Sequence, residues 1–177
     1  MQEIERLLKD VAFKMGTLRE ARSRFSAQLA PDFRIFDYLR SDEMGLSKCI
    51  ASLLDPNGTH GQGRVFLATF LKKFGSESTW VSTSEDCKVV TEKQANGQRR
   101  IDIYLDFIKT GIIGIENKPW AGDQDLQLSD YAAFIKNEAG NRKWLLVYLS
   151  NCDPGENSIT TGERKKLEDS GEFLRLS

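Results

Sequence analysis

Residues 99–118, RRIDIYLDFIKTGIIGIENK, decide the fold of this chain. Two runs in which apolar and polar residues alternate, 99–108 and 112–118, flank the turn Lys109-Thr110-Gly111, and this arrangement predicts an antiparallel pair of strands. One face of the first strand is expected to carry Ile101, Ile103, Leu105 and Phe107, and its other face Arg100, Asp102, Tyr104 and Asp106. On the second strand Ile113, Ile115 and Asn117 share one face, and Ile112, Gly114, Glu116 and Lys118 share the other.

Burial of the apolar residues selects the register of this pair. Residues directly opposite each other in an antiparallel pair point to the same side of the sheet. The register that sets Asp102 opposite Glu116 also joins the apolar face of the first strand to Ile113 and Ile115. A shift by one residue sets Asp102 opposite Asn117 and separates the apolar side chains. The sequence therefore predicts that Asp102 and Glu116 lie close together.

Two adjacent carboxylates repel each other unless a positive charge lies between them. Mg²⁺, or alternatively Mn²⁺, takes a few carboxylate oxygens and leaves its other positions to water and substrate phosphate. Lys118 shares the face of Glu116 and is placed to stabilise a metal-bound hydroxide or the charge that develops on a phosphate. This set of groups indicates phosphodiester hydrolysis. From spacing alone, a surface salt bridge among Asp102, Glu116 and Lys118 remains an equal alternative.

The elements on either side predict an α/β fold with a mixed sheet. A strand over 87–94 precedes the pair, joined by a turn at Asn96-Gly97, and a helix over 123–138 and a strand over 143–150 follow it. Before the sheet, helices are expected over 3–29, 33–40, 43–54 and 64–73, with a turn-rich loop over 55–63. The order is helices, three strands, helix and strand.

The motifs in this order resemble a known family. Arg100-Ile101-Asp102, Glu116-Asn117-Lys118 and Gln127-Leu128-Ser129-Asp130-Tyr131 are similar to the D…ExK…QxxxY signature of the PD-(D/E)XK nuclease superfamily, on the side of its RecB-type exonucleases. Residues 43–63 also resemble an uncharacterised bacterial subgroup of that superfamily, and the resemblance covers about residues 43–150. It implies a restriction-endonuclease-like αβββαβ core with an additional N-terminal helical segment. We therefore expect a helical extension over 1–40 and a single nuclease-like domain over 41–177.

The resemblance also implies an activity and a site. The activity would be metal-dependent hydrolysis of DNA, with Asp102 and Glu116 as metal ligands and Lys118 as the catalytic lysine. Glu43 matches the position of an acid that often completes the metal site, and Gln127 with Tyr131 would position the DNA backbone or the lysine. The sequence departs from the family at Ile101-Asp102, where Pro-Asp is usual, and its ending at 171–177 suggests a shortened protein.

Other residues are candidates for substrate contact. Arg99 and Arg100 lie beside Asp102 and could contact phosphate, and Trp120 could stack on an unpaired base or cover the helix that follows it. His60, the single histidine, fits better as a packing residue of its loop than as a catalytic group.

Composition bears on the partners and the cellular location of the protein. With 25 basic and 26 acidic residues, the formal charge is −1, so no overall positive charge indicates a nucleic-acid or membrane partner. Three cysteines without paired spacing predict free thiols, and with no signal or spanning segment recognised, we expect a cytoplasmic protein without a membrane partner.

The first helix has an amphipathic seam. Ile4, Leu8, Val11, Met15, Leu18, Phe25 and Leu29 recur at steps of four and three, with Arg22 interrupting the stripe. Packing on its own chain is the favoured interpretation, and a homodimer through this helix is the alternative. This seam also supports a second functional hypothesis, a catalytically inactive nuclease-fold module that binds nucleic acid or protein.

Overall fold

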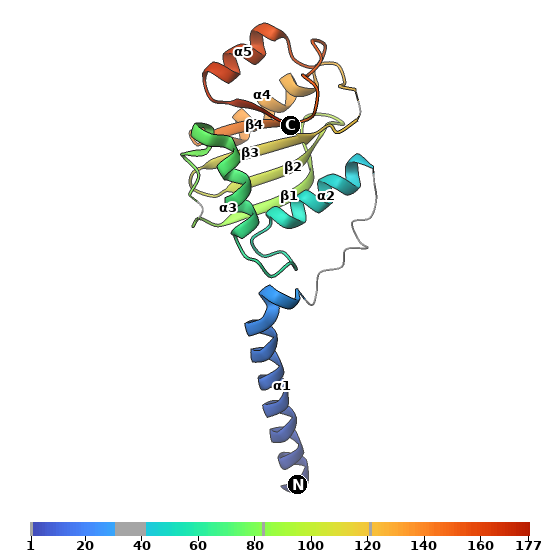
Figure 1. Ribbon diagram of the computed structural model, residues 1–177, viewed down its shortest axis with the longest axis vertical. Coiled ribbons are helices and arrows are strands. Elements are labelled where there is room, and N and C mark those ends of the chain that lie inside the picture. The colour runs from blue at the N-terminus through green and yellow to red at the C-terminus, as the bar shows by residue number, and fades with distance from the viewer. Residues whose placement is uncertain (1, 31–41, 83, 121) are drawn as a thin grey trace.

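A five-stranded mixed sheet in the order β1-β2-β3-β4-β5 forms the centre of the fold in the computed structural model, which describes residues 2–30, 42–82, 84–120 and 122–177 (Figure 1). The strands are β1 (Cys87–Gln94), β2 (Arg100–Phe107), β3 (Gly111–Asn117), β4 (Lys143–Leu149) and β5 (Phe173–Leu176). The first three are antiparallel neighbours, and β4 and β5 extend the sheet in parallel. The helix expected over 33–40 lies outside the described residues.

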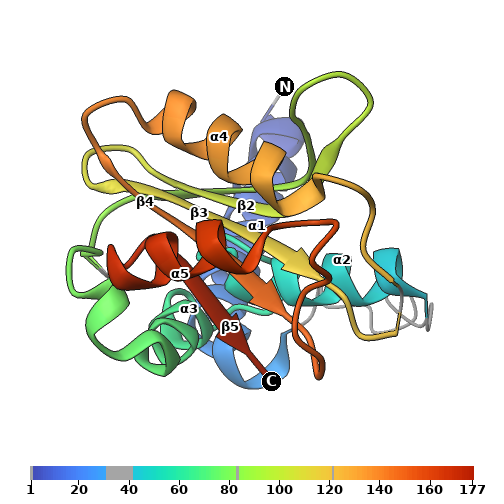
Figure 2. The same cartoon turned by 90° about the horizontal axis from the view of Figure 1, so that it is seen from above.

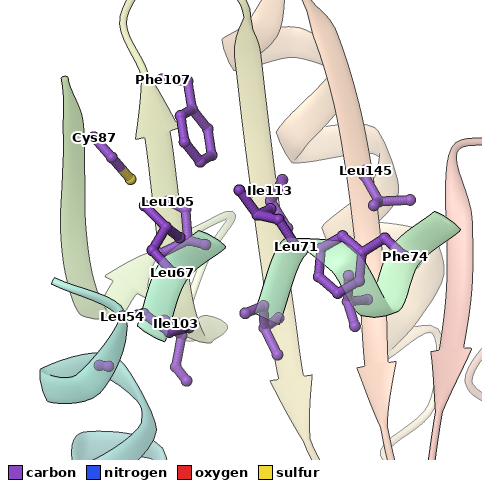
Figure 3. Packing of buried hydrophobic residues seen from close by; sticks show 13 residues of the cluster. Leu54, Leu67, Leu71, Phe74, Cys87, Ile103, Leu105, Phe107, Ile113 and Leu145 are labelled. Carbon is purple, nitrogen blue, oxygen red and sulfur yellow. The ribbon is translucent and has the colours of Figure 1, made fainter. Parts of the chain in front are cut away.

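Helices cover both faces of this sheet. They are α1 (Gln2–Leu29), α2 (Glu43–Leu54), α3 (Val65–Leu71), followed by a 3-10 segment (Lys72–Ser78), α4 (Gln127–Ala139) and α5 (Thr161–Asp169). Figure 2 shows α2 and α4 on opposite sides of the sheet. On the α2 and α3 side, Leu54, Leu67 and Leu71 pack on Ile103, Leu105 and Ile113 (Figure 3). The order α2-β1-β2-β3-α4-β4 confirms the predicted αβββαβ plan, to which α5 and β5 are added.

The register of β2 and β3 is the predicted one. Ile103 pairs with Ile115 and Tyr104 with Gly114, which places Asp102 at the level of Glu116. The main-chain pairing between the two strands ends there, and the Asp102 carboxylate accepts a 2.8 Å hydrogen bond from the Asn117 N–H. The end of the hairpin is therefore closed by an acidic side chain.

The alternation of faces along β2 breaks at Asp102. Ile103 packs on the α2 side, whereas Ile101 lies in the apolar cluster beneath α4, so the prediction that the two share a face is wrong. The break coincides with Glu92, which lies opposite Asp102 on β1, has a φ of 53° and interrupts the pairing between the two strands. A left-handed residue at this point rotates the strand locally.

Helix α4 begins at Gln127, four residues later than the predicted Asp123. The Asp123 carboxylate accepts hydrogen bonds from Tyr148 Oη at 2.9 Å and Gly155 N at 2.6 Å, which hold this segment in a loop. Gly114 lets the helix lie close to the sheet, because a Cβ there would be 2.3 Å from Ile135 Cδ1. Residues at the start of α4 are thus brought over the ends of β2 and β3.

Helix α1 projects away from the sheet (Figure 1). Its seam side chains from Ile4 to Phe25 are 48% to 64% exposed, so the expectation that α1 packs on its own chain is wrong. The physical reason is that both faces of the sheet are already covered, by α2 and α3 on one side and by α4 on the other. Among the helices of the described ranges, none combines the length and apolar character needed to cross a membrane.

Candidate metal centre

Three carboxylates from three different elements converge at the end of the β2-β3 pair. Glu43 is the first residue of α2, Asp102 lies on β2 and Glu116 on β3, and each offers an oxygen within 4.8 Å of those of the other two. Asp102 is 9% and Glu116 1% exposed. The predicted proximity of Asp102 and Glu116 is confirmed. The ion pair of the alternative interpretation also forms, since Lys118 Nζ lies 3.1 Å from Glu116 Oε1, but it is buried and does not lie at the surface.

Helix capping and the sheet position these acids. Asp42 caps α2 by accepting a 2.8 Å hydrogen bond from Gly45 N, which fixes Glu43 in the first turn. The hydroxyl of Ser47, one turn further along α2, donates to the Glu43 carbonyl at 2.9 Å and accepts from Asn117 Nδ2 at 3.0 Å. Ser47 and Asn117 therefore tie α2 to β3 beneath the acids.

These two linking residues were not predicted as part of the site. Asn117 lies between Glu116 and Lys118 in the sequence, and Ser47 follows Glu43 by one helical turn. This proximity to predicted site residues was the only sequence feature that could have indicated their role. Both are buried polar residues, and such groups need partners.

Lys118 lies between two of the carboxylates. Its Nζ is 2.7 Å from Glu43 Oε1 and 3.1 Å from Glu116 Oε1, and the side chain is buried. Burial by itself lowers the pKa of Lys118, but the carboxylates of Glu116 and Glu43 raise it more, so the pKa lies above its usual range. The lysine therefore remains an ammonium and offsets part of the negative charge of the cluster.

Gln127 contacts Glu116 directly, and Tyr131 contacts Gln127. Gln127 Nε2 donates to Glu116 Oε1 at 2.8 Å and lies 3.2 Å from Tyr131 Oη, which in turn donates to the Arg100 carbonyl at 2.5 Å. The two residues lie one above the other on α4, as their i and i+4 spacing predicts. Their observed contacts fix the orientation of the Glu116 carboxylate.

The pKa values of the two buried acids, Asp102 and Glu116, are raised. Burial raises the pKa of Asp102 to about 7, the nearby Glu43 carboxylate adds to the rise, and the Asn117 N–H opposes it. Burial and the neighbouring Asp102 likewise hold the pKa of Glu116 well above its usual range. Within the described residues, Glu116 Oε2 is buried and has no hydrogen-bond partner.

An oxygen-only donor set of this kind fits a hard divalent cation. Three carboxylates each offer an oxygen within 4.8 Å of the others, and Glu116 Oε2 has no hydrogen-bond partner to displace. A bound cation would also offset the burial and the carboxylate repulsion that together raise the pKa values of Asp102 and Glu116.

The predicted substrate-contact residues lie around this centre. The Arg99 Nε is 2.5 Å from an Asp130 carboxylate oxygen, so this side chain anchors the first turn of α4. Arg100 is more exposed and lies 3.9 Å from Glu92. Trp120 is 71% exposed and lines a pocket of about 330 Å³ together with Lys118 and Tyr148.

His60 lies outside the centre, and the prediction that it packs its loop is confirmed. The ring is buried, with Nε2 3.0 Å from the Asp55 carbonyl and Nδ1 accepting from Gln62 N at 3.0 Å. It also contacts Phe66 edge-on, with ring centroids 5.1 Å apart.

One family comparison bears on this centre. The sequence model of the family described as the PD-(D/E)XK nuclease superfamily matches residues 33–174. The matched range begins after α1 and contains all three carboxylates, Lys118 and the Gln127-Tyr131 pair. Searches among curated proteins and among solved structures return no match.

Proposed function

This chain belongs to the PD-(D/E)XK nuclease superfamily, and on that premise we propose that it is a metal-dependent nuclease that hydrolyses phosphodiester bonds of DNA. Nucleases of this superfamily use divalent metals, and the chain carries an acidic cluster of the corresponding type. The observation that carries the proposal is the buried, unpartnered Glu116 Oε2 among three carboxylates that share one lysine. Buried polar atoms usually have a hydrogen-bond partner, so an unpartnered carboxylate oxygen at this point supports a bound ligand.

Each residue of the cluster has a distinct role in this proposal. Asp102, Glu116 and Glu43 would hold Mg²⁺, or Mn²⁺ in its place, which would supply an acidified water and neutralise phosphate charge. Lys118 keeps its proton and stabilises negative charge on the phosphate oxygens through its ammonium group. Gln127 and Tyr131 are positioning residues, because they orient the carboxylate of Glu116 through hydrogen bonds.

The experiment that tests this function measures cleavage and metal binding together. The protein is expected to cleave DNA with Mg²⁺ or Mn²⁺ and to lose this activity in EDTA. Each cation should also raise the midpoint of thermal unfolding, since a ligand that binds only the folded state stabilises it. Ca²⁺, which also takes oxygen ligands, serves as a comparison for binding without cleavage. Metal binding without cleavage of any nucleic acid would favour the alternative of an inactive binding module.

We further propose that Arg100 and Trp120 contact the substrate. Trp120 is exposed beside Lys118, where an unpaired base could stack on its ring. Trp120→Ala is expected to lower cleavage of single-stranded DNA about tenfold while Trp120→Phe keeps most of the activity, because loss of one stacked base costs about 1–3 kcal/mol. Arg100→Ala should weaken binding of any sequence and reduce its salt dependence. Equal kinetics for Trp120→Ala and the unmodified protein on single-stranded DNA would remove this residue from the site.

A further inference from the structure

The exposed seam of α1 is not used by the nuclease site. The apolar side chains Ile4, Leu8, Val11, Met15, Leu18 and Phe25 follow steps of four and three, apart from Arg22, which occupies one position of the same series. All six apolar side chains are 48% to 64% exposed, and the family match begins only at residue 33. A seam of this length extends over more than three heptads of helix.

A helix with this pattern needs a partner. Most of the stability of a helix comes from packing of its apolar face, and residue propensity alone rarely suffices in water. Burial of apolar surface contributes about 25 cal/mol per Å², so pairing of the seam is strongly favoured over its exposure. We propose that α1 pairs with the α1 of a second copy of this chain as an antiparallel coiled coil.

The charges of α1 select the antiparallel orientation. In a parallel pair each seam residue faces its own counterpart, so Arg22 would face Arg22 of the second copy, and Lys14 would flank Arg19 of that copy. These are like-charge contacts, and they destabilise the parallel pair. In an antiparallel pair with full overlap, Arg22 lies against Val11 of the other helix, and its aliphatic stem packs there while the guanidinium group reaches solvent.

With the same overlap, apolar residues of the two helices face each other in successive layers. Leu8 of one copy faces Phe25 of the other, and in the two central layers Met15 of one copy faces Leu18 of the other. Lys14 is already paired with Asp10 of its own helix at 2.9 Å, on the flank of the seam. Phe13 is exposed but lies outside the seam, so it takes no part in the interface.

The antiparallel pair places the carboxyl ends of the two α1 helices at opposite ends of a rod about 40 Å long at a rise of 1.5 Å per residue. Each nuclease unit follows its own α1, so the two units are attached at opposite ends of this rod.

Light scattering after size exclusion tests the dimer without reference to nuclease activity. The full chain is expected to have twice the mass of one copy, and Leu18→Glu should halve that mass by placing a charge in a central layer. Phe13→Glu is the matched control, because it adds the same charge on the same helix outside the seam and should leave the dimer intact. A monomer for the unmodified chain across the accessible concentration range, or dissociation by Phe13→Glu alone, would overturn the proposal.

Cross-linking tests the orientation. In a Cys49→Ser, Cys152→Ser background, single variants Leu8→Cys and Phe25→Cys are mixed, allowed to exchange and oxidised. The antiparallel pair predicts a disulfide-linked dimer from the mixture and little from either variant alone. A strong self-cross-link of Leu8→Cys would instead show the parallel pair and overturn the orientation. Circular dichroism of each variant confirms that the fold is retained.

Discussion

Asp102→Asn is expected to abolish metal-dependent cleavage and at the same time to stabilise the metal-free protein. The substitution keeps the shape of the side chain and its ability to accept the hydrogen bond from Asn117 N. It removes one of the proposed metal ligands, so the rate should fall by about 10³-fold or more, since several kcal/mol of transition-state stabilisation depend on the metal. Single-turnover cleavage at saturating DNA measures this loss.

The gain in stability follows from the pKa of Asp102. Burial first, and then the nearby Glu43 carboxylate, raise this pKa from 3.8 to about 7 in the folded protein. Below about pH 4 the carboxyl is protonated in both the folded and the unfolded states. Between about pH 4 and pH 7 it ionises in the unfolded state but stays protonated in the folded state, so the folded state loses stability relative to the unfolded one. Asp102→Asn avoids this cost, so its unfolding free energy at pH 8 should exceed that of the unmodified protein by as much as about 4 kcal/mol, the equivalent of the raised pKa.

Urea unfolding of the metal-free proteins at pH 4.5 and pH 8 measures this difference. The advantage of Asp102→Asn should be largest at pH 8 and fall to about 1 kcal/mol at pH 4.5, where only a small part of the pH-dependent loss has developed. Asp106→Asn is the control on the same strand, where the carboxylate pairs with Arg142 at 2.7 Å. It should leave cleavage unchanged and lower stability slightly. Undiminished cleavage by Asp102→Asn would contradict the proposed metal centre.

Lys118→Met is expected to lower the cleavage rate by about 10²–10³-fold while metal binding persists. The ammonium group of Lys118 lies within 3.1 Å of both Glu43 and Glu116, and a methionine keeps its length without its charge. Removal of this charge leaves the two carboxylates uncompensated in a buried site. The metal-free variant should therefore lose about 3 kcal/mol of unfolding free energy.

Addition of Mg²⁺ should recover most of that stability but not the rate, because the cation replaces the lost charge without replacing the lysine. Thermal unfolding with and without metal, combined with single-turnover cleavage, separates the two effects. Lys93→Met is the control. Lys93 lies on β1, and its Nζ is 3.7 Å from Glu138 on α4, so it pairs with an acid outside the carboxylate cluster. This substitution should leave cleavage unchanged. Recovery of the cleavage rate by metal alone would contradict a catalytic role for Lys118.

These two predictions describe one property of the site. Asp102 and Glu116 are acids whose burial, together with the neighbouring carboxylates, raises their pKa values, and Lys118 offsets part of this negative charge. The same unbalanced charge favours binding of a divalent cation. Stability in the absence of metal and affinity for metal are therefore expected to change in opposite directions among variants of the three carboxylates.

The central hairpin was predictable because local pattern and burial agree there. A shift by one residue would expose the apolar face of β2, so the sequence alone specified that Asp102 lies level with Glu116. The break in alternation at Ile101 was not predictable, because it depends on the left-handed conformation of Glu92 on the neighbouring strand. The start of α4 was misplaced for a similar reason, since Asp123 is held by Tyr148 and Gly155 from later in the chain.

The sequence by itself identified the candidate site residues: two acids and a lysine on paired strands, and Gln127 with Tyr131 on one side of a helix. Period-two and i, i+4 spacing are local rules, and they suffice to bring such residues onto common faces. The family resemblance had implied Glu43 as a third acid, and the tertiary structure brings its carboxylate next to the other two. Only the tertiary structure decided that Ser47 and Asn117 tie the elements together and that α1 leaves its seam exposed. These features depend on how α1 and α2 lie relative to the sheet. Packing across the whole fold sets that arrangement, and local spacing in the sequence does not encode it.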